Sequence, residues 1–203
     1  PHPLAWIEDF RQQYKVPDVP GLPRFNGGLV GYFGYETIGY IEPRLQNRTK
    51  PDPIGTPDIL LMVSQDLLVF DNLSGKMLLL THADPAQDNA YHNAKARLDR
   101  LVAKLREPHA HPKPHASSKQ VQETDFISGF TQQGFEDAVG KVKQYITDGD
   151  CMQVVLSQRM SIPFGAAPLD LYRALRCLNP SPYMYYLNLD DFHIVGSSPE
   201  ILV

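Results

Sequence analysis

A proline-rich segment divides this chain and limits what it can fold into. Residues 107–120 read Glu-Pro-His-Ala-His-Pro-Lys-Pro-His-Ala-Ser-Ser-Lys-Gln. Proline has no backbone N–H and a fixed φ, and the segment has no large apolar side chain to place in a core. We therefore expect a linker at 107–120 between an N-terminal region, 1–106, and a second region, 121–203. His109, His111 and His115 could ligate a metal, but the prolines hold them on an extended chain, which favours a linker.

Composition and charge are those of an ordinary globular protein. Hydrophobic residues make up 42% of the 203 residues and charged residues 21%, and the net charge is -4. A chain without a basic surface is not expected to bind nucleic acid or an anionic membrane. No apolar run approaches the roughly 20 residues that span a bilayer. The chain has two cysteines, Cys151 and Cys177, which lie far apart in the sequence. So low a cysteine content favours a reduced, cytoplasmic protein.

The N-terminal region mixes helical and strand patterns. Apolar residues at helical spacing predict helices within 4–14 and 86–106. Residues 25–36 interleave glycine with aromatic and branched side chains, which predicts a strand with close backbone approaches. Residues 59–82 contain apolar runs separated by Asp-Asn-Leu-Ser-Gly, the pattern of a β-meander.

The second region alternates helices and strands. Helical spacing recurs within 135–146, with Gly149 placed to end that helix, and again within 169–178. Residues 151–164 read as a strand. An apolar hairpin follows a proline turn at 179–182. Mixed elements on both sides of the linker predict an α+β fold, with antiparallel sheets and flanking helices.

Four motifs resemble a known family. Phe25-Asn-Gly-Gly-Leu-Val-Gly-Tyr-Phe-Gly-Tyr-Glu36, Asp148-Gly-Asp-Cys-Met-Gln-Val-Val-Leu-Ser-Gln-Arg159, Asn179-Pro-Ser-Pro-Tyr-Met184 and Val195-Gly-Ser-Ser-Pro-Glu200 are similar, in that order, to component I of anthranilate synthase. The resemblance covers essentially this whole chain but only the middle of the family's polypeptide. The chain also ends at Val203 inside an apolar run. We expect it to be part of a larger protein, with residues 121–203 beginning a chorismate-binding catalytic domain.

The resemblance implies a reaction and its partners. The family is Mg²⁺-dependent. It adds ammonia at C2 of chorismate with loss of the C4 hydroxyl, and then eliminates pyruvate to give anthranilate. A glutamine amidotransferase subunit, component II, supplies the ammonia. L-Tryptophan inhibits from a site distinct from that of chorismate.

The resemblance assigns two catalytic residues. Glu200, in Ser-Pro-Glu, matches the general acid that protonates the departing C4 hydroxyl, since hydroxide is a poor leaving group. Apolar neighbours such as Ile194 and Val195 would raise its pKa. Gln153 lies where water-using relatives carry a lysine base. An amide cannot take that proton, so glutamine favours ammonia as the nucleophile.

Pro182, Tyr183 and Met184 match the part of the family that contacts tryptophan. A rigid proline, an aromatic ring and a thioether could form a flat apolar wall for an indole. Asn179 and Ser181 are expected to hold the turn. Packing of these residues into a core is the alternative.

Other parts of the family pattern have no counterpart here. These are the Leu-Leu-Glu-Ser element of the tryptophan site, the Mg²⁺-binding glutamates and the groups that hold the chorismate carboxylates. We therefore expect this chain alone to be inactive and to contain no metal site. Two alternatives stay open: component I of aminodeoxychorismate synthase, which aminates C4, and a noncatalytic amino-acid-sensing module. A lysine in the Pro-Ile-Lys-Gly-Thr motif elsewhere would mark the aminodeoxychorismate enzyme, and tight tryptophan binding by this chain alone would support the sensor.

Overall fold

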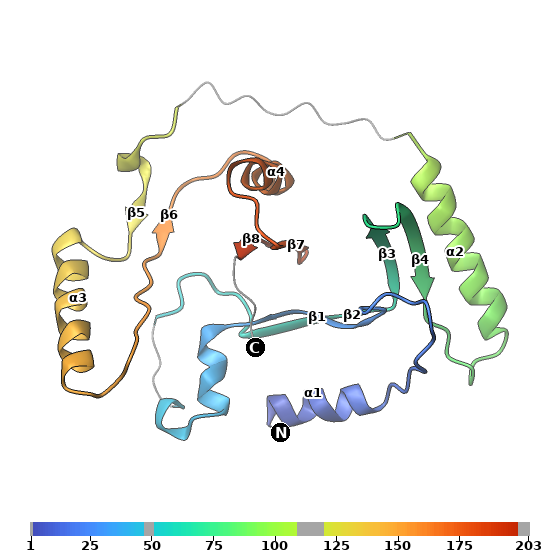
Figure 1. The fold of residues 1–203 in the computed structure, drawn as a ribbon, viewed down its shortest axis with the longest axis horizontal. Helices are drawn as coiled ribbons and strands as arrows, with labels where there is room; N and C mark the ends of the chain where they lie inside the picture. The colour runs from blue at the N-terminus through green and yellow to red at the C-terminus, as the bar shows by residue number, and fades with distance from the viewer. Residues whose placement is uncertain (1, 47–50, 109–119, 199–203) are drawn as a thin grey trace. The chain divides into compact units, whose positions relative to one another are not determined.

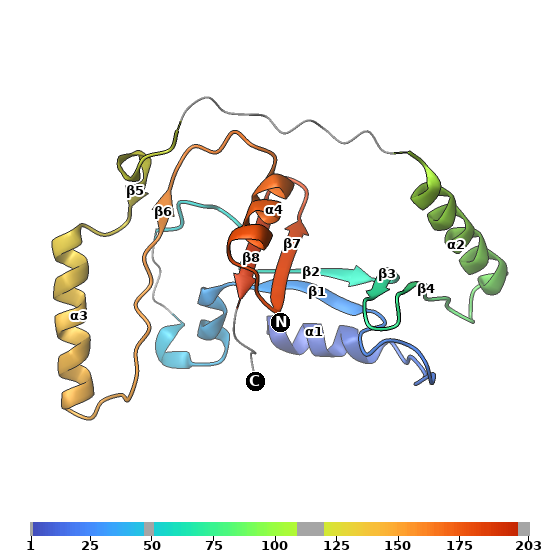
Figure 2. The same ribbon diagram turned by 45° about the horizontal axis from the view of Figure 1, so that its top comes forward.

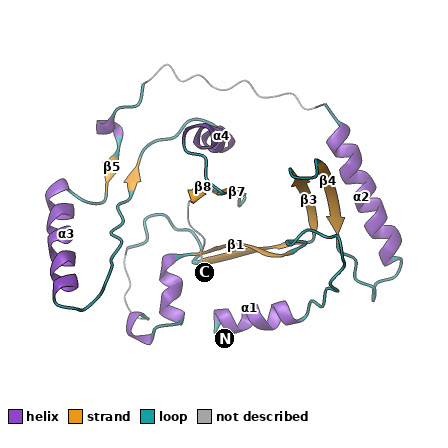
Figure 3. Ribbon diagram, viewed as in Figure 1, coloured by secondary structure: helices purple, strands orange, loops and turns teal. Residues whose placement is uncertain are grey.

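A computed structural model describes residues 2–46, 51–108 and 120–198 (Figure 1). The chain forms two compact units, Pro1–Ala110 and His111–Val203, and each is described by itself. Helices and two-stranded antiparallel sheets occur in both units, which confirms the predicted α+β class (Figure 3). Most of the predicted linker, including its three histidines, lies outside the described residues.

The first unit contains both predicted helices and four strands. In chain order its elements are α1 (Pro3–Gln12), β1 (Gly28–Phe33), the 3-10 helices η1 (Tyr35–Tyr40) and η2 (Pro43–Leu45), β2 (Ile59–Ser64), β3 (Asp66–Asp71), β4 (Lys76–Thr81) and α2 (Ala90–Arg106).

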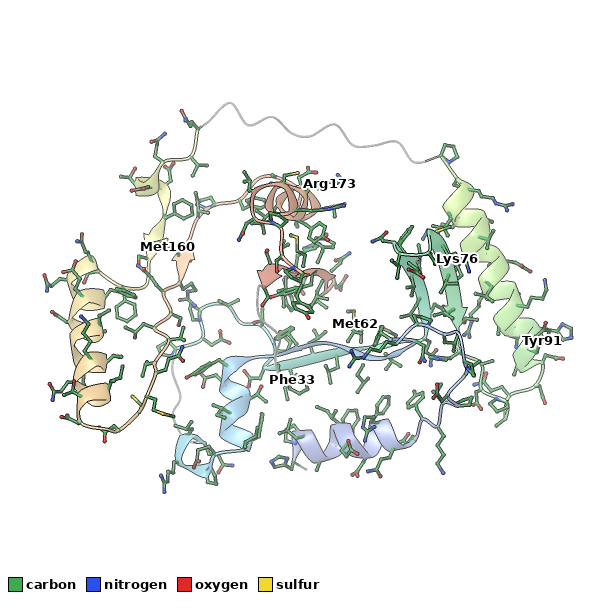
Figure 4. The ribbon with its side chains drawn as sticks, viewed as in Figure 1. Phe33, Met62, Lys76, Tyr91, Met160 and Arg173 are labelled. Carbon is green, nitrogen blue, oxygen red and sulfur yellow. The ribbon has the colours of Figure 1, made fainter. Side chains whose placement is uncertain are left out.

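Glycine permits the close pairing of β1 with β2. The strands are antiparallel, from Gly28 opposite Ser64 to Phe33 opposite Ile59. Figure 4 labels Phe33 on β1 and Met62 on β2. A Cβ at Gly31 would overlap the carbonyl group of Leu60. This is the close backbone approach that the glycine-rich sequence predicts.

The Asp71 carboxylate closes the β3–β4 hairpin. It accepts hydrogen bonds from the backbone N–H of Leu73 at 3.0 Å and of Ser74 at 3.1 Å, and one from the Ser74 hydroxyl. These bonds, led by that of the Ser74 side chain, lower the pKa of Asp71 below its usual value. The left-handed φ of 67° at Gly75 completes the turn. The carboxylate thus holds the turn that the sequence predicts here.

The predicted meander through 59–82 is only half right. β3 pairs with β4, but β2 pairs with β1 instead of β3. Only Gln65 separates β2 from β3, which is too short for a hairpin turn. The chain therefore passes directly from one small sheet into the next.

Helix α2 packs against β4. Ala94 is 8% exposed on this helix. One turn further on, Arg97 donates from Nη2 to the carbonyl oxygen of His82, and its Nε lies 3.8 Å from Asp66 Oδ1. The packed face is therefore apolar at Ala94 and polar at Arg97.

The second unit contains the segments named as functional by sequence. Its elements are η3 (Glu123–Asp125), β5 (Ile127–Ser128), α3 (Gln132–Thr147), β6 (Met160–Ser161), α4 (Pro168–Leu178), β7 (Tyr183–Asn188) and β8 (His193–Ser198). Helix α3 begins at the Thr131 hydroxyl, which accepts from the N–H of Gly134 at 3.1 Å. It ends before Gly149, whose φ of 82° confirms the predicted C-terminal glycine.

The predicted strand at 151–164 is mostly wrong. Only Met160 and Ser161 are paired, with Ser128 and Ile127 of β5. Residues 151–159 belong to no strand. A strand needs the N–H and C=O groups of a neighbour along its length. In this stretch the Arg159 carbonyl, next to β6, accepts from the Gly129 N–H, and no strand ladder continues from there through the described residues. β propensity without a partner does not make a strand.

The terminal hairpin forms as predicted. β7 and β8 are antiparallel, from Tyr183 opposite Ser198 to Asn188 opposite His193. Helix α4 lies beside both strands (Figure 2). The ring of Tyr186 meets the ring of Tyr172 of α4 edge-on, with centroids 6.2 Å apart. This contact identifies the face of the hairpin that α4 covers.

Candidate functional site

The predicted ligand turn, residues 179–184, joins α4 to β7. Helix α4 ends at Leu178, and the N–H of Asn179 still donates to the carbonyl of Leu175 at 2.8 Å. Pro180 and Pro182 follow, and β7 begins at Tyr183. Both prolines lack an N–H, so neither can continue the helix or the strand ladder. They account for the sharp change from helix to strand.

Two serine hydroxyls bond this turn to β8. Ser181 Oγ donates to the carbonyl oxygen of Ser198 and accepts from the N–H of Tyr183 at 3.2 Å. Ser197 Oγ donates to the carbonyl oxygen of Asn179 at 2.8 Å. Sequence reasoning expected Asn179 and Ser181 to hold the turn, but it missed Ser197 and Ser198. No local pattern marks those two, because their partners lie 17 and 18 residues away.

Tyr183 and Met184 lie on opposite faces of the hairpin. Successive side chains alternate along a strand, so Met184 shares a face with Tyr186, which meets α4. Tyr183 lies on the other face and is 45% exposed. The turn thus brings Pro182, Tyr183 and Met184 together in the chain, but Tyr183 and Met184 do not form one flat wall. A ligand on one face of the hairpin could contact one of these two side chains but not the other, unless it extended past the edge of the strand to the opposite face.

The face that carries Tyr183 is continued by Tyr185. Tyr185 is opposite Gly196, and a Cβ at Gly196 would overlap its ring. The ring therefore lies over the glycine and fills the space of the missing side chain, while Tyr185 stays 42% exposed. This face offers aromatic surface to a ligand or to another part of a longer protein.

The described structure places one of the two predicted catalytic residues, Gln153. Gln153 is exposed, in the stretch 151–159, which belongs to no strand. That stretch is held near its end, where Gln158 Nε2 donates to Ser128 Oγ at 2.6 Å and the N–H of Gly129 donates to the Arg159 carbonyl at 3.0 Å. Glu200 lies outside the described residues.

A metal ion needs several ligating side chains close together. Among residues 2–46, 51–108 and 120–198, no three His, Cys, Asp or Glu side chains are grouped closely enough to hold one. We therefore assign no Mg²⁺ ligand to this part of the chain. Within the same ranges, no helix combines the length and the apolar character needed to cross a membrane.

A sequence profile of chorismate-binding enzymes matches residues 1–203. The chain belongs to the chorismate-binding enzyme family. This confirms the resemblance found in its motifs.

Anthranilate synthases of several bacteria are similar to the chain. "Anthranilate synthase component 1" of Pseudomonas aeruginosa is 57% identical over 202 residues, which are 99% of this chain and 41% of that protein. The protein of the same name from Neisseria meningitidis serogroup B is 56% identical over 205 residues, covering 100% of this chain and 41% of its own length. A crystal structure of anthranilate synthase component I from Streptococcus pneumoniae matches with a TM-score of 0.76 at 30% identity, over 95% of this chain and 43% of that one. The chain thus spans about two-fifths of the length of these relatives.

Proposed function

We propose that this chain is part of component I of an anthranilate synthase, which converts chorismate and ammonia into anthranilate, pyruvate and water in tryptophan biosynthesis. The observation that carries the proposal is the 57% identity, over 99% of this chain, to a relative of that name. Aminodeoxychorismate synthase component I stays the nearest alternative.

Glu200 is the proposed general acid. Ammonia attacks C2 of chorismate, the ring double bonds shift, and the C4–O bond breaks. A carboxylic acid that protonates the departing oxygen lets it leave as water instead of hydroxide. The assignment rests on the Ser-Pro-Glu motif at the end of the chain. Loss of the C2 proton and of pyruvate then gives the aromatic product.

Gln153 is proposed to face the incoming nucleophile. Its amide can donate and accept hydrogen bonds but cannot act as a base at neutral pH. Ammonia, unlike water, needs no deprotonation before it attacks carbon. Support comes from the motif at 148–159, in which Gln153 is exposed.

The turn at 179–184 is the proposed regulatory site for L-tryptophan, with Pro182, Tyr183 and Met184 as contact residues. The alternation of side chains along β7 divides this site. Either the half-buried Met184 or the exposed Tyr183 meets the indole ring, while Pro182 precedes both. Backbone groups of the turn are proposed to meet the amino or carboxylate group of the ligand.

The remaining partners belong to the intact enzyme. We propose that it works in the cytoplasm, requires Mg²⁺ held by residues elsewhere in the longer protein, and receives ammonia from a glutamine amidotransferase subunit. The chain described here is expected to be inactive alone. Residues 121–203 are proposed to begin the chorismate-binding domain, and residues 1–106 to form a separate N-terminal region.

Complementation in bacteria tests the proposal. The full-length gene should restore growth without tryptophan to a strain that lacks anthranilate synthase component I. It should not restore growth without p-aminobenzoate to a strain that lacks aminodeoxychorismate synthase component I. Rescue of the second strain alone would overturn the proposal in favour of the folate-pathway enzyme.

A further inference from the structure

The strand ladder of the hairpin stops where the proposed regulatory turn begins. Tyr183 and Ser198 form the last pair of β7 and β8. The next residue on the β7 side is Pro182, whose nitrogen carries no hydrogen. Position 182 therefore has no backbone N–H that could donate a hydrogen bond to β8.

Side-chain hydroxyls supply the missing connections. Ser181 Oγ bridges the Tyr183 N–H and the Ser198 carbonyl, and it is partly buried. Ser197 Oγ reaches the Asn179 carbonyl at 2.8 Å. One hydroxyl comes from the turn and the other from β8, so the two bonds run in opposite directions across the same gap. Together these two hydroxyl groups bond the turn to β8.

We propose that Ser181 and Ser197 are positioning residues that couple the turn at 179–184 to the strand leading to Glu200. The inference rests on the proposed function, in which the turn binds tryptophan and Glu200 is the general acid. Glu200 follows Ser198 by two residues in the sequence. A ligand that shifts the N–H of Tyr183 shifts Ser181 Oγ, and with it the Ser198 carbonyl. The effector thereby reaches β8, which precedes Glu200 in the sequence, through one hydroxyl group.

Coupling of this kind has a measurable definition. If tryptophan and chorismate favour different positions of the turn, each weakens binding of the other by the same factor. Removal of a hydroxyl should lower that factor, while tryptophan keeps its own contacts. A purely structural role would lower the stability but leave the factor unchanged in the folded enzyme.

The test uses full-length enzyme with Ser181→Ala and Ser197→Ala. Tryptophan affinity without chorismate is measured by calorimetry. The coupling factor comes from half-inhibitory tryptophan concentrations at low and at saturating chorismate. Ser181→Thr and Ser197→Thr keep a hydroxyl, and Ser181→Cys and Ser197→Cys keep the volume with a weaker donor. Ser161→Ala, at an exposed position of β6, is the matched control.

Each alanine variant should lower the coupling factor roughly 3- to 10-fold, the effect of losing one hydrogen bond, with tryptophan affinity changed less than about threefold. Threonine should restore the factor, cysteine should give a smaller loss, and the control should match wild type. If the alanine variants do not fold, the cysteine variants decide by the same comparison. If tryptophan inhibits the wild-type enzyme but the alanine variants have an unchanged coupling factor, this inference is overturned and the proposed function is not. A wild-type enzyme that tryptophan does not inhibit overturns the proposed regulation as well.

Discussion

The ring of Tyr185 in β7 lies over Gly196, its register partner in β8, in the space that any larger side chain at position 196 would need. Gly31 in β1 shows the same crowding with a different neighbour, the carbonyl group of Leu60. A ring can rotate away, whereas the backbone of a paired strand cannot. The two glycines should therefore differ in how much a methyl group costs.

We predict that alanine at Gly31 destabilises the protein more than alanine at Gly196. Gly31→Ala should cost about 1–3 kcal/mol or more, because overpacking against backbone forces the strands apart. Gly196→Ala should cost about 1 kcal/mol through displacement of the Tyr185 ring. Gly140→Ala in α3, where an added Cβ meets nothing within 4 Å, is the control and should stabilise by about 0.4–1 kcal/mol. Hydrogen exchange of the strand and helix amides measures all three, and equal effects at Gly31 and Gly196 would contradict the assigned contacts.

The β3–β4 turn predicts a pH dependence. Because the Asp71 pKa is lowered in the folded state by Ser74, Asp71 contributes stability that is present above its unfolded pKa. That contribution is lost as pH falls through the folded pKa. Ser74→Ala should raise the Asp71 pKa, because the largest of the bonds that lower it is removed, and Ser74→Thr should keep it low. Carboxyl NMR titration checks this, and identical Asp71 curves in wild type and Ser74→Ala would rule out the hydroxyl as the cause.

Replacement of the proposed general acid tests the catalytic assignment. Glu200→Gln in the full-length enzyme should slow the amination step by roughly 10²–10⁴-fold, the usual contribution of general acid catalysis. Tryptophan binding should persist, since its site is distinct. Glu136→Gln on the exposed face of α3 is a matched control and should retain full activity. A loss below about threefold in Glu200→Gln would remove that residue from catalysis.

The regulatory assignment is tested by Pro182→Ser and Met184→Thr. Each should weaken tryptophan inhibition while leaving uninhibited turnover close to normal, because an effector acts only through its difference in affinity for two states. Replacing a half-buried thioether with a smaller polar group should cost about 1–3 kcal/mol, or roughly 5–150-fold in effector affinity. Inhibition curves of anthranilate formation supply the measurement. Met160→Thr, at an exposed methionine of β6, is the control and should be inhibited like wild type. If Pro182→Ser and Met184→Thr also give the wild-type inhibition curve, the turn has no role in tryptophan binding.

Local patterns predicted the parts of the fold that depend on neighbours in sequence. Helical spacing marked α3 and α4, the left-handed Gly149 ended α3, and the prolines marked the turn before β7. The pairing of strands that are distant in the sequence could not be predicted. The partner of β2 is β1, across a long connection. Residues 151–159 have strand composition but belong to no strand of the described structure.

The candidate site shows the same division. Motif resemblance named Pro182, Tyr183 and Met184, but only the register of the hairpin showed that two of them lie on opposite faces. Ser197 was not singled out, because a serine in a strand has no distinguishing pattern until its partner across the hairpin is known. Long-range hydrogen bonds therefore limit what can be read from the sequence.

Product analysis of the full-length enzyme tests the proposed function most directly. The purified protein is given chorismate, Mg²⁺ and ¹⁵N-labelled ammonium, and the products are identified by mass spectrometry. Anthranilate carrying one ¹⁵N, with one equivalent of pyruvate, is the predicted result. A labelled product that is aminated at C4 and retains the enolpyruvyl group, or an unlabelled hydroxylated product, would contradict it.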